Sequence, residues 1–190
     1  MHIHLVRPRD QAQLYEAFLA ASITAEDVQA HHIPRSGFFE YPLSERDLEA
    51  RAQTPFSVVA EDSRSRLLGY IIGYPIAHAR QQLAQGVYHD PVHDTFEGLD
   101  DHTLYLDQLY LARAQPVTVA ARMFDTWEHL LRGEKVPNVV TAIPQLPWKN
   151  ESCTRFVLYR GFSRHGFAAS SAVTLGLFGK PYVAIGENIL

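Results

Sequence analysis

A strand, a helix and a second strand follow one another in residues 103–143, and this succession limits the fold more than any other feature. Residues 103–111 alternate between apolar and polar side chains, which is typical of a β-strand. Residues 116–132 carry apolar side chains at helical spacing, and residues 136–143 form another short strand-like run. Strands that alternate with helices along a chain build a sheet covered by helices. The segment therefore predicts an α/β fold.

The flanking sequence extends this pattern into a single domain with a mixed sheet. A chain of 190 residues lies in the usual size range of one domain, so we expect residues 1–190 to share one fold. Residues 77–102 show no sustained period and predict a long loop. The other predicted elements are a strand at 3–7, helices at 10–21 and 44–53, a β-hairpin at 56–60 and 67–76, a helix at 150–160, and strands at 162–167 and 171–178.

The composition excludes several classes of protein. Hydrophobic residues make up 46% of the chain and charged residues 20%, which is typical of a globular domain. The net charge of -4 gives no general attraction for nucleic acid. No stretch is apolar enough to span a membrane, so we expect a cytoplasmic protein that binds neither nucleic acid nor a membrane. The single cysteine, Cys153, excludes an intrachain disulfide.

Residues 105–111, Tyr-Leu-Asp-Gln-Leu-Tyr-Leu, resemble the fourth strand of the GNAT N-acyltransferases. In that family this strand splays from its neighbour, and its free backbone groups pair with the pantetheine arm of acetyl-coenzyme A. The resemblance implies main-chain contacts to the cofactor from Leu109 and Leu111, whereas Tyr110 either contacts the cofactor or packs in the core. It also implies a single-domain GNAT-like fold. Its central sheet would be mixed, mostly antiparallel and flanked by helices, with a splayed strand pair forming the cofactor cleft.

The next helix begins with a variant of the family's pyrophosphate turn, whose pattern is Arg or Gln, then x-x-Gly-x-Gly or Ala. Free N–H groups of a helix's first turn bind a pyrophosphate where no side chain blocks the approach. Thr118 stands in place of a glycine and Pro116 lacks an N–H, so we expect weakened rather than abolished affinity for coenzyme A. The residues that the resemblance assigns to the cofactor here are Gln115, Val117, Thr118, Val119, Ala120 and Ala121.

Residues 150–162 resemble a third segment of the family, N-x-x-[AS]-x-x-F-Y-x-x-x-G-F. In this pattern the asparagine precedes a helix, and Gly-Phe begins the next strand. The resemblance implies that Asn150 and Cys153 lie beside the cofactor, and Asn150 is equally suited to cap the helix. The residues in register are Asn150, Cys153, Phe156, Gly161 and Phe162.

Val157 is the departure that matters for mechanism. It occupies the position of the tyrosine often credited in this family with protonating the departing thiolate. Tyr159 lies two residues further on, about 200° round a helix, and does not substitute for it. Either the thiolate takes its proton from water or another group, or the protein does not catalyse acetyl transfer.

Asp107 is the candidate catalytic residue. It stands where many family members carry a glutamate that accepts a proton from the substrate ammonium, directly or through water. An amine must be neutral to attack a thioester, so a carboxylate near the acyl group would assist the reaction. The alternative is a strand carboxylate that faces solvent.

These resemblances predict an N-acetyltransferase that moves an acetyl group from acetyl-coenzyme A to an amine of a small molecule or peptide. The reaction would be a direct attack in a ternary complex. The alternative is a catalytically inactive GNAT-like protein that binds an acyl-coenzyme A or another ligand. If the acidic 77–102 loop rims the acceptor site, it would favour a cationic amine.

The sequence gives no strong indication of a metal site, and we expect none. His89 and His93 have a spacing that suits two metal ligands only on a helix, whereas Pro91 between them indicates a loop. At the other end of the chain, residues 180–190 include an apolar run that suits an additional strand exchanged across a homodimer.

Overall fold

The computed structural model describes residues 1–22, 43–84, 98–113, 115–146, 149–169 and 174–182. Within these ranges no helix is both long and apolar enough to cross a membrane. The helices are η1 (Pro8–Asp10), α1 (Gln11–Ala21), α3 (Glu45–Ala52), α4 (Ile76–Ala84), α5 (Val117–Gly133) and α6 (Glu151–Tyr159). The strands are β1 (His2–Leu5), β2 (Val58–Glu61), β3 (Leu67–Pro75), β4 (Leu104–Leu111), β5 (Asn138–Leu146), β6 (Ser163–Ala169) and β7 (Thr174–Pro181).

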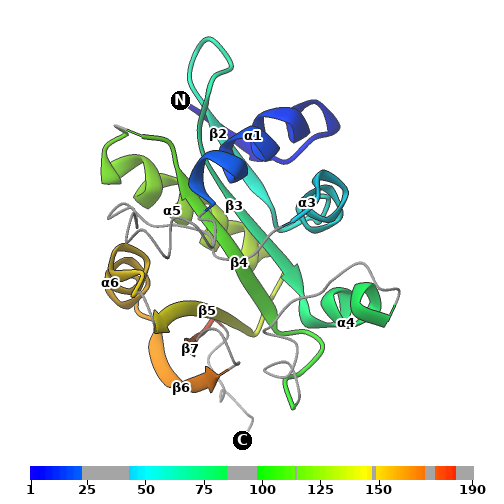
Figure 1. Ribbon diagram of the computed structural model, residues 1–190, viewed down its shortest axis with the longest axis vertical. Coiled ribbons are helices and arrows are strands. Elements are labelled where there is room, and N and C mark those ends of the chain that lie inside the picture. The colour runs from blue at the N-terminus through cyan, green and yellow to red at the C-terminus, as the bar shows by residue number, and fades with distance from the viewer. Residues whose placement is uncertain (23–42, 85–97, 114, 147–148, 170–173, 183–190) are drawn as a thin grey trace, which may run out of the picture.

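The strands form one seven-stranded sheet in the order β1-β2-β3-β4-β5-β7-β6 (Figure 1). The pair β4–β5 is parallel, and the other neighbouring pairs are antiparallel. The parallel pair is joined by α5, as a crossover between parallel strands requires. The predicted α/β class and the mixed, mostly antiparallel sheet are therefore confirmed.

The parallel pair separates soon after it forms. Leu104 pairs with Val139 and Tyr105 pairs with Val140, and the register between the two strands ends there. One hydroxyl spans the start of the gap, because Thr141 Oγ1 donates to the carbonyl oxygen of Leu106 at 2.8 Å. Beyond this point β4 continues along β3 and β5 continues along β7. The splayed strand pair predicted from the family resemblance is therefore present.

A β-bulge in β4 lies at the point where the strands separate. On β3, Gly73 pairs with Leu106 and the adjacent Ile72 pairs with Gln108, which leaves Asp107 as the extra residue. A bulge bends its strand and increases the local twist. The bulge therefore turns the end of β4 away from β5.

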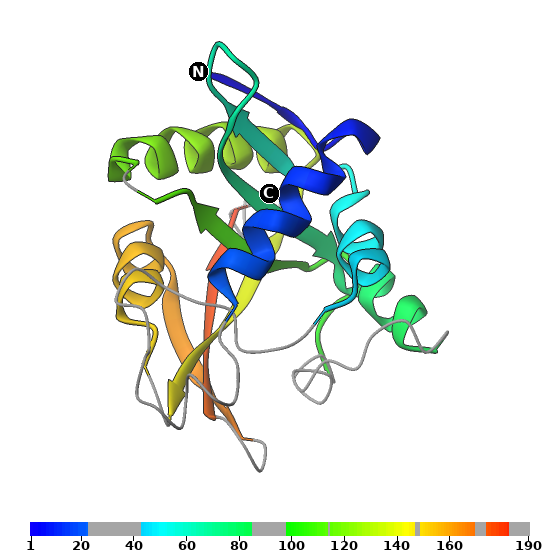
Figure 2. The same ribbon diagram turned by 45° about the horizontal axis from the view of Figure 1, so that its top comes forward.

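Each face of the sheet carries its own apolar core. On one face α1 and α3 contribute Leu14 and Leu48, and on the other α5 contributes Trp127. Figure 2 shows α1 and α5 on opposite faces. The adjacent strand residues Ile71 and Ile72 belong to different cores, as the alternation of side chains along a strand requires.

Two expectations from the sequence need correction. The loop predicted at 77–102 is helical at its start, because α4 extends from Ile76 to Ala84. Alanine and glutamine favour helices, and the buried side chains of Ile76 and Ala79 hold α4 against the core. The helix is too short for the sequence to show a helical repeat of apolar residues. The helical spacing of Ala12, Leu14, Tyr15, Phe18 and Leu19 also predicts one apolar face for residues 10–21. On α1, however, Leu19 is 52% exposed and Ala17 is buried instead.

Several other expectations fall on residues outside the described ranges. They concern the histidines His89 and His93 and most of the terminal segment 180–190, of which the last eight residues are not described. The proposed strand exchange across a homodimer therefore stays a prediction.

Candidate active site

The site begins with the free edge of β4. Along this strand, Leu109 pairs with Ile71 of β3 and Tyr110 pairs with Tyr70. The opposite edge faces away from β3 and, within the described residues, has no strand partner after Tyr105. Leu109, Tyr110 and Leu111 are half-buried. A strand edge of this kind offers backbone N–H and C=O groups to an extended ligand.

Asp107 is held in a buried ion pair. Its Oδ2 accepts a hydrogen bond from Nη1 of Arg51 on α3 at 3.0 Å, and both side chains are 1% exposed. The residue as a whole is only half-buried, so its exposed part is the main chain. The alternative that Asp107 faces solvent is therefore wrong, and its catalytic role stays a prediction.

The residues beside Asp107 form a second buried polar contact on the same face. Tyr70 donates its hydroxyl hydrogen to Oε1 of Gln108 at 3.0 Å. Burial raises the pKa of Tyr70 well above its ordinary value, and the negative charge of Asp107 raises it further. The ring of Tyr70 also stacks on Tyr110, with centroids 5.1 Å apart. Together with Arg51, these contacts fix the bulged part of β4.

The first turn of α5 is open to solvent. Pro116 precedes the helix with extended backbone angles, φ -69° and ψ 148°, and its carbonyl accepts from Val119 N at 2.9 Å. Val117 is 66% exposed, and Thr118 is exposed as well. Ala120 is buried, whereas Gln115, Val119 and Ala121 are half-buried. The side chains around the positive end of this helix are therefore small or exposed. Such a helix end favours the binding of an anionic group.

The start of α6 is fixed by Asn150. Its side-chain oxygen accepts from Cys153 N at 3.2 Å, which confirms the predicted helix cap. Its main-chain N–H donates to the carbonyl of Pro144 at 3.0 Å, so α6 is tied to the end of β5. Burial raises the pKa of the Cys153 thiol to about 11, while its contact with Asn150 lowers it in part. In Figure 1, α6 and the start of α5 lie at the left of the view, next to the region where β4 and β5 diverge.

Neither Val157 nor Tyr159 of α6 is placed to act as the proton donor for the leaving thiolate. Val157 is buried in the core that α5 and α6 share. Tyr159 is 82% exposed on the outside of the helix. Neither residue offers a hydroxyl to the opening between the strands.

A pocket of about 570 Å³ lies beside the last residue pair of β4 and β5. Gly179 and His165 are among its lining residues, and the lack of a side chain at Gly179 leaves room for the His165 ring, since an added Cβ would lie 2.9 Å from that ring. Residues 98–100, from the end of the predicted loop, contribute to the rim. Its apolar lining includes Leu99, Tyr105, Val140, Ala142 and Leu177.

Arg51 is the site residue that sequence reasoning missed. It follows Leu48 by three residues, so it shares the buried face of α3 with Leu48 and Ala52. A cation on an apolar helix face is the signal that suggests a buried anion opposite. The sequence alone does not name the anion, because Asp107 is 56 residues away.

Sequence comparison finds no protein-family model and no curated protein that matches this chain. Solved structures do match. A GNAT-family acetyltransferase from Listeria monocytogenes is 17% identical, with a TM-score of 0.62 over 95% of this chain and 94% of that one. The ribosomal-protein-S18-alanine N-acetyltransferase from Escherichia coli is 10% identical, with a TM-score of 0.67 over 100% and 98%. Arylalkylamine N-acetyltransferase 2 from Aedes aegypti is 12% identical, with a TM-score of 0.62 over 96% and 99%.

The described residues therefore have the fold of the GNAT acetyltransferases. This confirms the fold that the family resemblance predicts.

Proposed function

We propose that this chain is a divergent GNAT N-acetyltransferase that transfers an acetyl group from acetyl-coenzyme A to an amine of a small molecule or peptide. The observation that carries the proposal is the separation of β4 from β5 after two residue pairs. That separation provides the strand edge on which an extended, amide-bearing ligand can pair. Two of the similar structures described above are named for an amine acceptor, a ribosomal-protein alanine and an arylalkylamine.

In the proposed complex the pantetheine arm lies along Leu109 and Leu111, beside Tyr110. The pyrophosphate lies at the first turn of α5, which is supported by the exposure of Val117 and Thr118 and by the lack of a side-chain cap on the helix. The other residues proposed to contact the cofactor are Gln115, Val117, Thr118, Val119, Ala120 and Ala121 on the α5 side and Asn150 and Cys153 on the α6 side.

The proposed reaction is a direct attack of the amine nitrogen on the thioester carbonyl. A carbon–nitrogen bond forms, the carbon–sulfur bond breaks, and coenzyme A leaves as a thiolate. Asp107 is proposed to accept the ammonium proton once the bound acceptor has reached its carboxylate, which in the free protein is buried against Arg51. The nitrogen loses its second proton as the amide forms, and water relays a proton to the thiolate, because Val157 provides no donor.

The pocket beside the base of the opening is the proposed place for the body of the acceptor. It adjoins Tyr105 and Val140, the last paired residues before the strands separate. Its walls are mostly apolar, which favours an acceptor that carries an apolar or aromatic group near its amine.

Thermal unfolding tests the cofactor site. The protein is heated alone, with acetyl-coenzyme A and with desulfo-coenzyme A, and release of free thiol is then measured with a panel of amines. We expect both ligands to raise Tm and at least one amine to release thiol. No shift at millimolar ligand rejects the proposal. A shift without thiol release favours the inactive acyl-coenzyme A binder, for which Val157 is the specific support.

A charge placed at the helix start locates the pyrophosphate. Thr118→Glu puts a carboxylate on an exposed position of the first turn, where it suits the helix but repels an anionic ligand. We expect the Kd for acetyl-coenzyme A to rise at least about 10-fold, equivalent to about 1.4 kcal/mol. Thr126→Glu, at an exposed position of the same helix, is the matched control and should leave Kd unchanged. Equal effects of the two variants contradict the assignment.

A further inference from the structure

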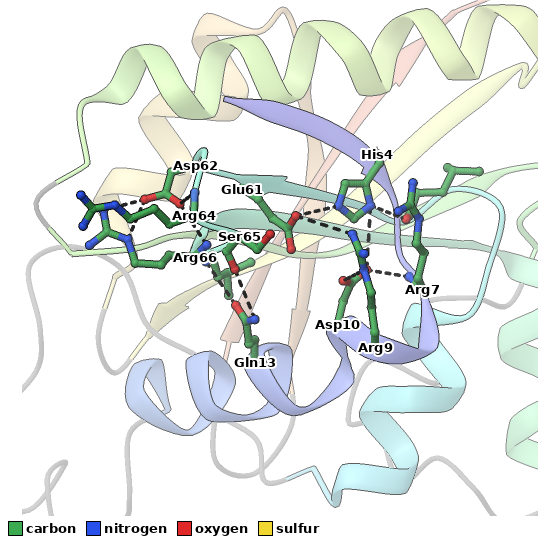
Figure 3. Close-up of polar contacts among 12 residues, drawn as sticks. His4, Arg7, Arg9, Asp10, Gln13, Glu61, Asp62, Arg64, Ser65 and Arg66 are labelled. Carbon is green, nitrogen blue, oxygen red and sulfur yellow. Dashed lines mark hydrogen bonds and ion pairs between the residues drawn. The ribbon is translucent and has the colours of Figure 1, made fainter.

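One histidine and two carboxylates converge near the β1 edge of the sheet, away from the opening between β4 and β5 (Figure 3). His4 comes from β1, Asp10 from η1 and Glu61 from the end of β2. One donor atom from each residue lies within 4.8 Å of the other two. Asp10 and Glu61 are buried, and the side chain of His4 is 13% exposed. Imidazole nitrogen and carboxylate oxygen are common ligands of Zn²⁺ and other first-row divalent ions.

The hydrogen bond of His4 leaves one ring nitrogen facing Glu61. Its Nδ1 lies 2.8 Å from the carbonyl oxygen of Leu5, which can only accept, so Nδ1 carries a hydrogen. In the neutral ring, Nε2 then has a lone pair. Nε2 is 3.3 Å from Oε2 of Glu61, and it is buried without a hydrogen-bond partner among the described residues. A histidine that binds a metal through one nitrogen typically donates the other N–H to such a carbonyl.

Asp10 is held in a similar way. Its Oδ2 accepts from the main-chain N–H of Arg7 at 2.8 Å, and Oδ1 lies 3.5 Å from Nε of Arg9. The same Oδ2 lies 3.8 Å from Nδ1 of His4, so Oδ1, which now faces Arg9, is the oxygen left to bind an ion. His4 and Asp10 therefore each have an outer hydrogen bond of the kind that fixes a metal ligand.

Arg9 marks a route by which an ion can enter. Its side chain is 61% exposed and lies 3.5 Å from Asp10 and 3.9 Å from Glu61. These distances exceed the roughly 2.7–2.9 Å of charge-assisted hydrogen bonds, so the guanidinium is loosely held. One guanidinium faces two carboxylates, which leaves an excess negative charge when His4 is neutral. Figure 3 shows Arg9 beside the cluster.

We propose that His4, Asp10 and Glu61 bind a divalent first-row transition-metal ion, with Zn²⁺ the best match and Arg9 displaced into solvent. Bonds of about 2.0–2.2 Å place donor pairs roughly 3.3–4.3 Å apart. The 3.3 Å between His4 and Glu61 already matches, and the widest pair closes by at most about half an ångström. The ion joins β1, β2 and the start of α1. This proposal departs from the expectation, drawn from the sequence, that the chain binds no metal.

Metal titration of the untagged protein tests the site. Tm is measured with ZnCl₂, CoCl₂ and MgCl₂ after treatment with a chelator, and the visible absorption of Co²⁺ reports its coordination. We expect Zn²⁺ at about 100 times its Kd to raise Tm by roughly 5–10 °C, since it binds only the folded chain. Mg²⁺ should have little effect, because it prefers sites made of oxygen alone.

Three variants separate a metal site from an ion-pair cluster. His4→Gln should abolish both the Tm shift and the Co²⁺ bands, whereas His129→Gln, at an exposed histidine of α5, should leave them unchanged. Arg9→Gln retains all three ligands and removes the competing cation, so the Kd for Zn²⁺ should fall about 5-fold. Absence of the shift in the wild-type protein overturns the proposal. So does a shift that survives in the His4 variant or is lost in the His129 variant.

Discussion

The two faces of the sheet bury charge in different ways. On the face of α1 and α3, Arg51 and Asp107 form an ion pair that is sealed from water. On the face of α5, the buried carboxylate of Glu128 is bonded by Lys180 at 2.6 Å and by Tyr182 at 2.9 Å, and both partners keep part of their surface in solvent. A charge left alone in a sealed site has no water to replace its lost partner. The sealed pair should therefore be the more costly one to break.

The largest expected effect comes from breaking the sealed pair. Arg51→Gln and Asp107→Asn should each lower the free energy of unfolding by about 3–5 kcal/mol, because each leaves one buried charge uncompensated. The double variant Arg51→Met with Asp107→Leu should lose less than either single variant. Urea unfolding measures all three. If the double variant loses as much free energy of unfolding as the two single variants together, the cost does not come from an unpaired buried charge.

The same two variants separate stability from catalysis. Arg51→Gln breaks the ion pair but keeps the Asp107 carboxylate, whereas Asp107→Asn removes it. If Asp107 accepts the amine proton, Asp107→Asn should lower turnover far more than Arg51→Gln, which keeps the carboxylate, under conditions where both variants are folded. Equal losses of turnover in the two variants would remove Asp107 from the proposed catalytic role.

A smaller effect is expected at Glu128. Burial alone would raise the pKa of Glu128, but hydrogen bonds from Lys180 and Tyr182 and the nearby positive charges bring it below its ordinary value of 4.5. The ionised group therefore stabilises the fold above pH 4.5, and this contribution is lost as the pH falls through the lowered pKa. Glu128→Gln should cost about 1–2 kcal/mol at neutral pH, less than the sealed pair, since its partners regain water.

Unfolding at neutral and acidic pH checks the sign of the Glu128 effect. The gap between wild-type protein and Glu128→Gln should narrow below pH 4.5. Glu134→Gln, at an exposed carboxylate just after the same helix, should show no gap at either pH. A gap for Glu128→Gln that does not change with pH would be inconsistent with the network.

The smallest effect concerns the half-buried thiol of Cys153, whose neighbour Asn150 is neutral. Burial raises the pKa of Cys153 to about 11 against the weak opposing effect of Asn150. The thiol of the folded protein should therefore react slowly with iodoacetamide at neutral pH, and faster as the pH approaches about 11. Denatured protein provides the control with an ordinary thiol. Equal rates in folded and denatured protein at neutral pH would show that Cys153 is not protected.

The features that the sequence predicts are local ones. Ser44 begins α3 by accepting from Asp47 N at 3.1 Å, and Asn150 begins α6, as their positions before helical segments indicate. The separation of β4 from β5 could be predicted only through the family resemblance, because no pattern of residue types marks the place where two strands diverge. The order of the predicted elements matches the structure except for the added helix α4.

The features that the sequence does not predict depend on contacts between distant residues. Arg80 of α4 pairs with Asp101 and also donates to the Leu99 carbonyl at 2.8 Å, which fixes a helix that its own periodicity does not indicate. His4 and Glu61 meet because β1 and β2 are neighbours, although more than fifty residues separate them. Side-chain types are visible in the sequence, but their convergence depends on strand order and register.

The short contact between β4 and β5 has a mechanical consequence. Two residue pairs and the Thr141–Leu106 bond make a narrow seam between one half of the sheet, β1 to β4, and the other, β5 to β7. A seam this small resists twisting far less than a full ladder of strand pairs. A ligand that lay along both arms would act as an inserted strand and stiffen the joint. The freedom of the two halves would then depend on whether the opening is occupied.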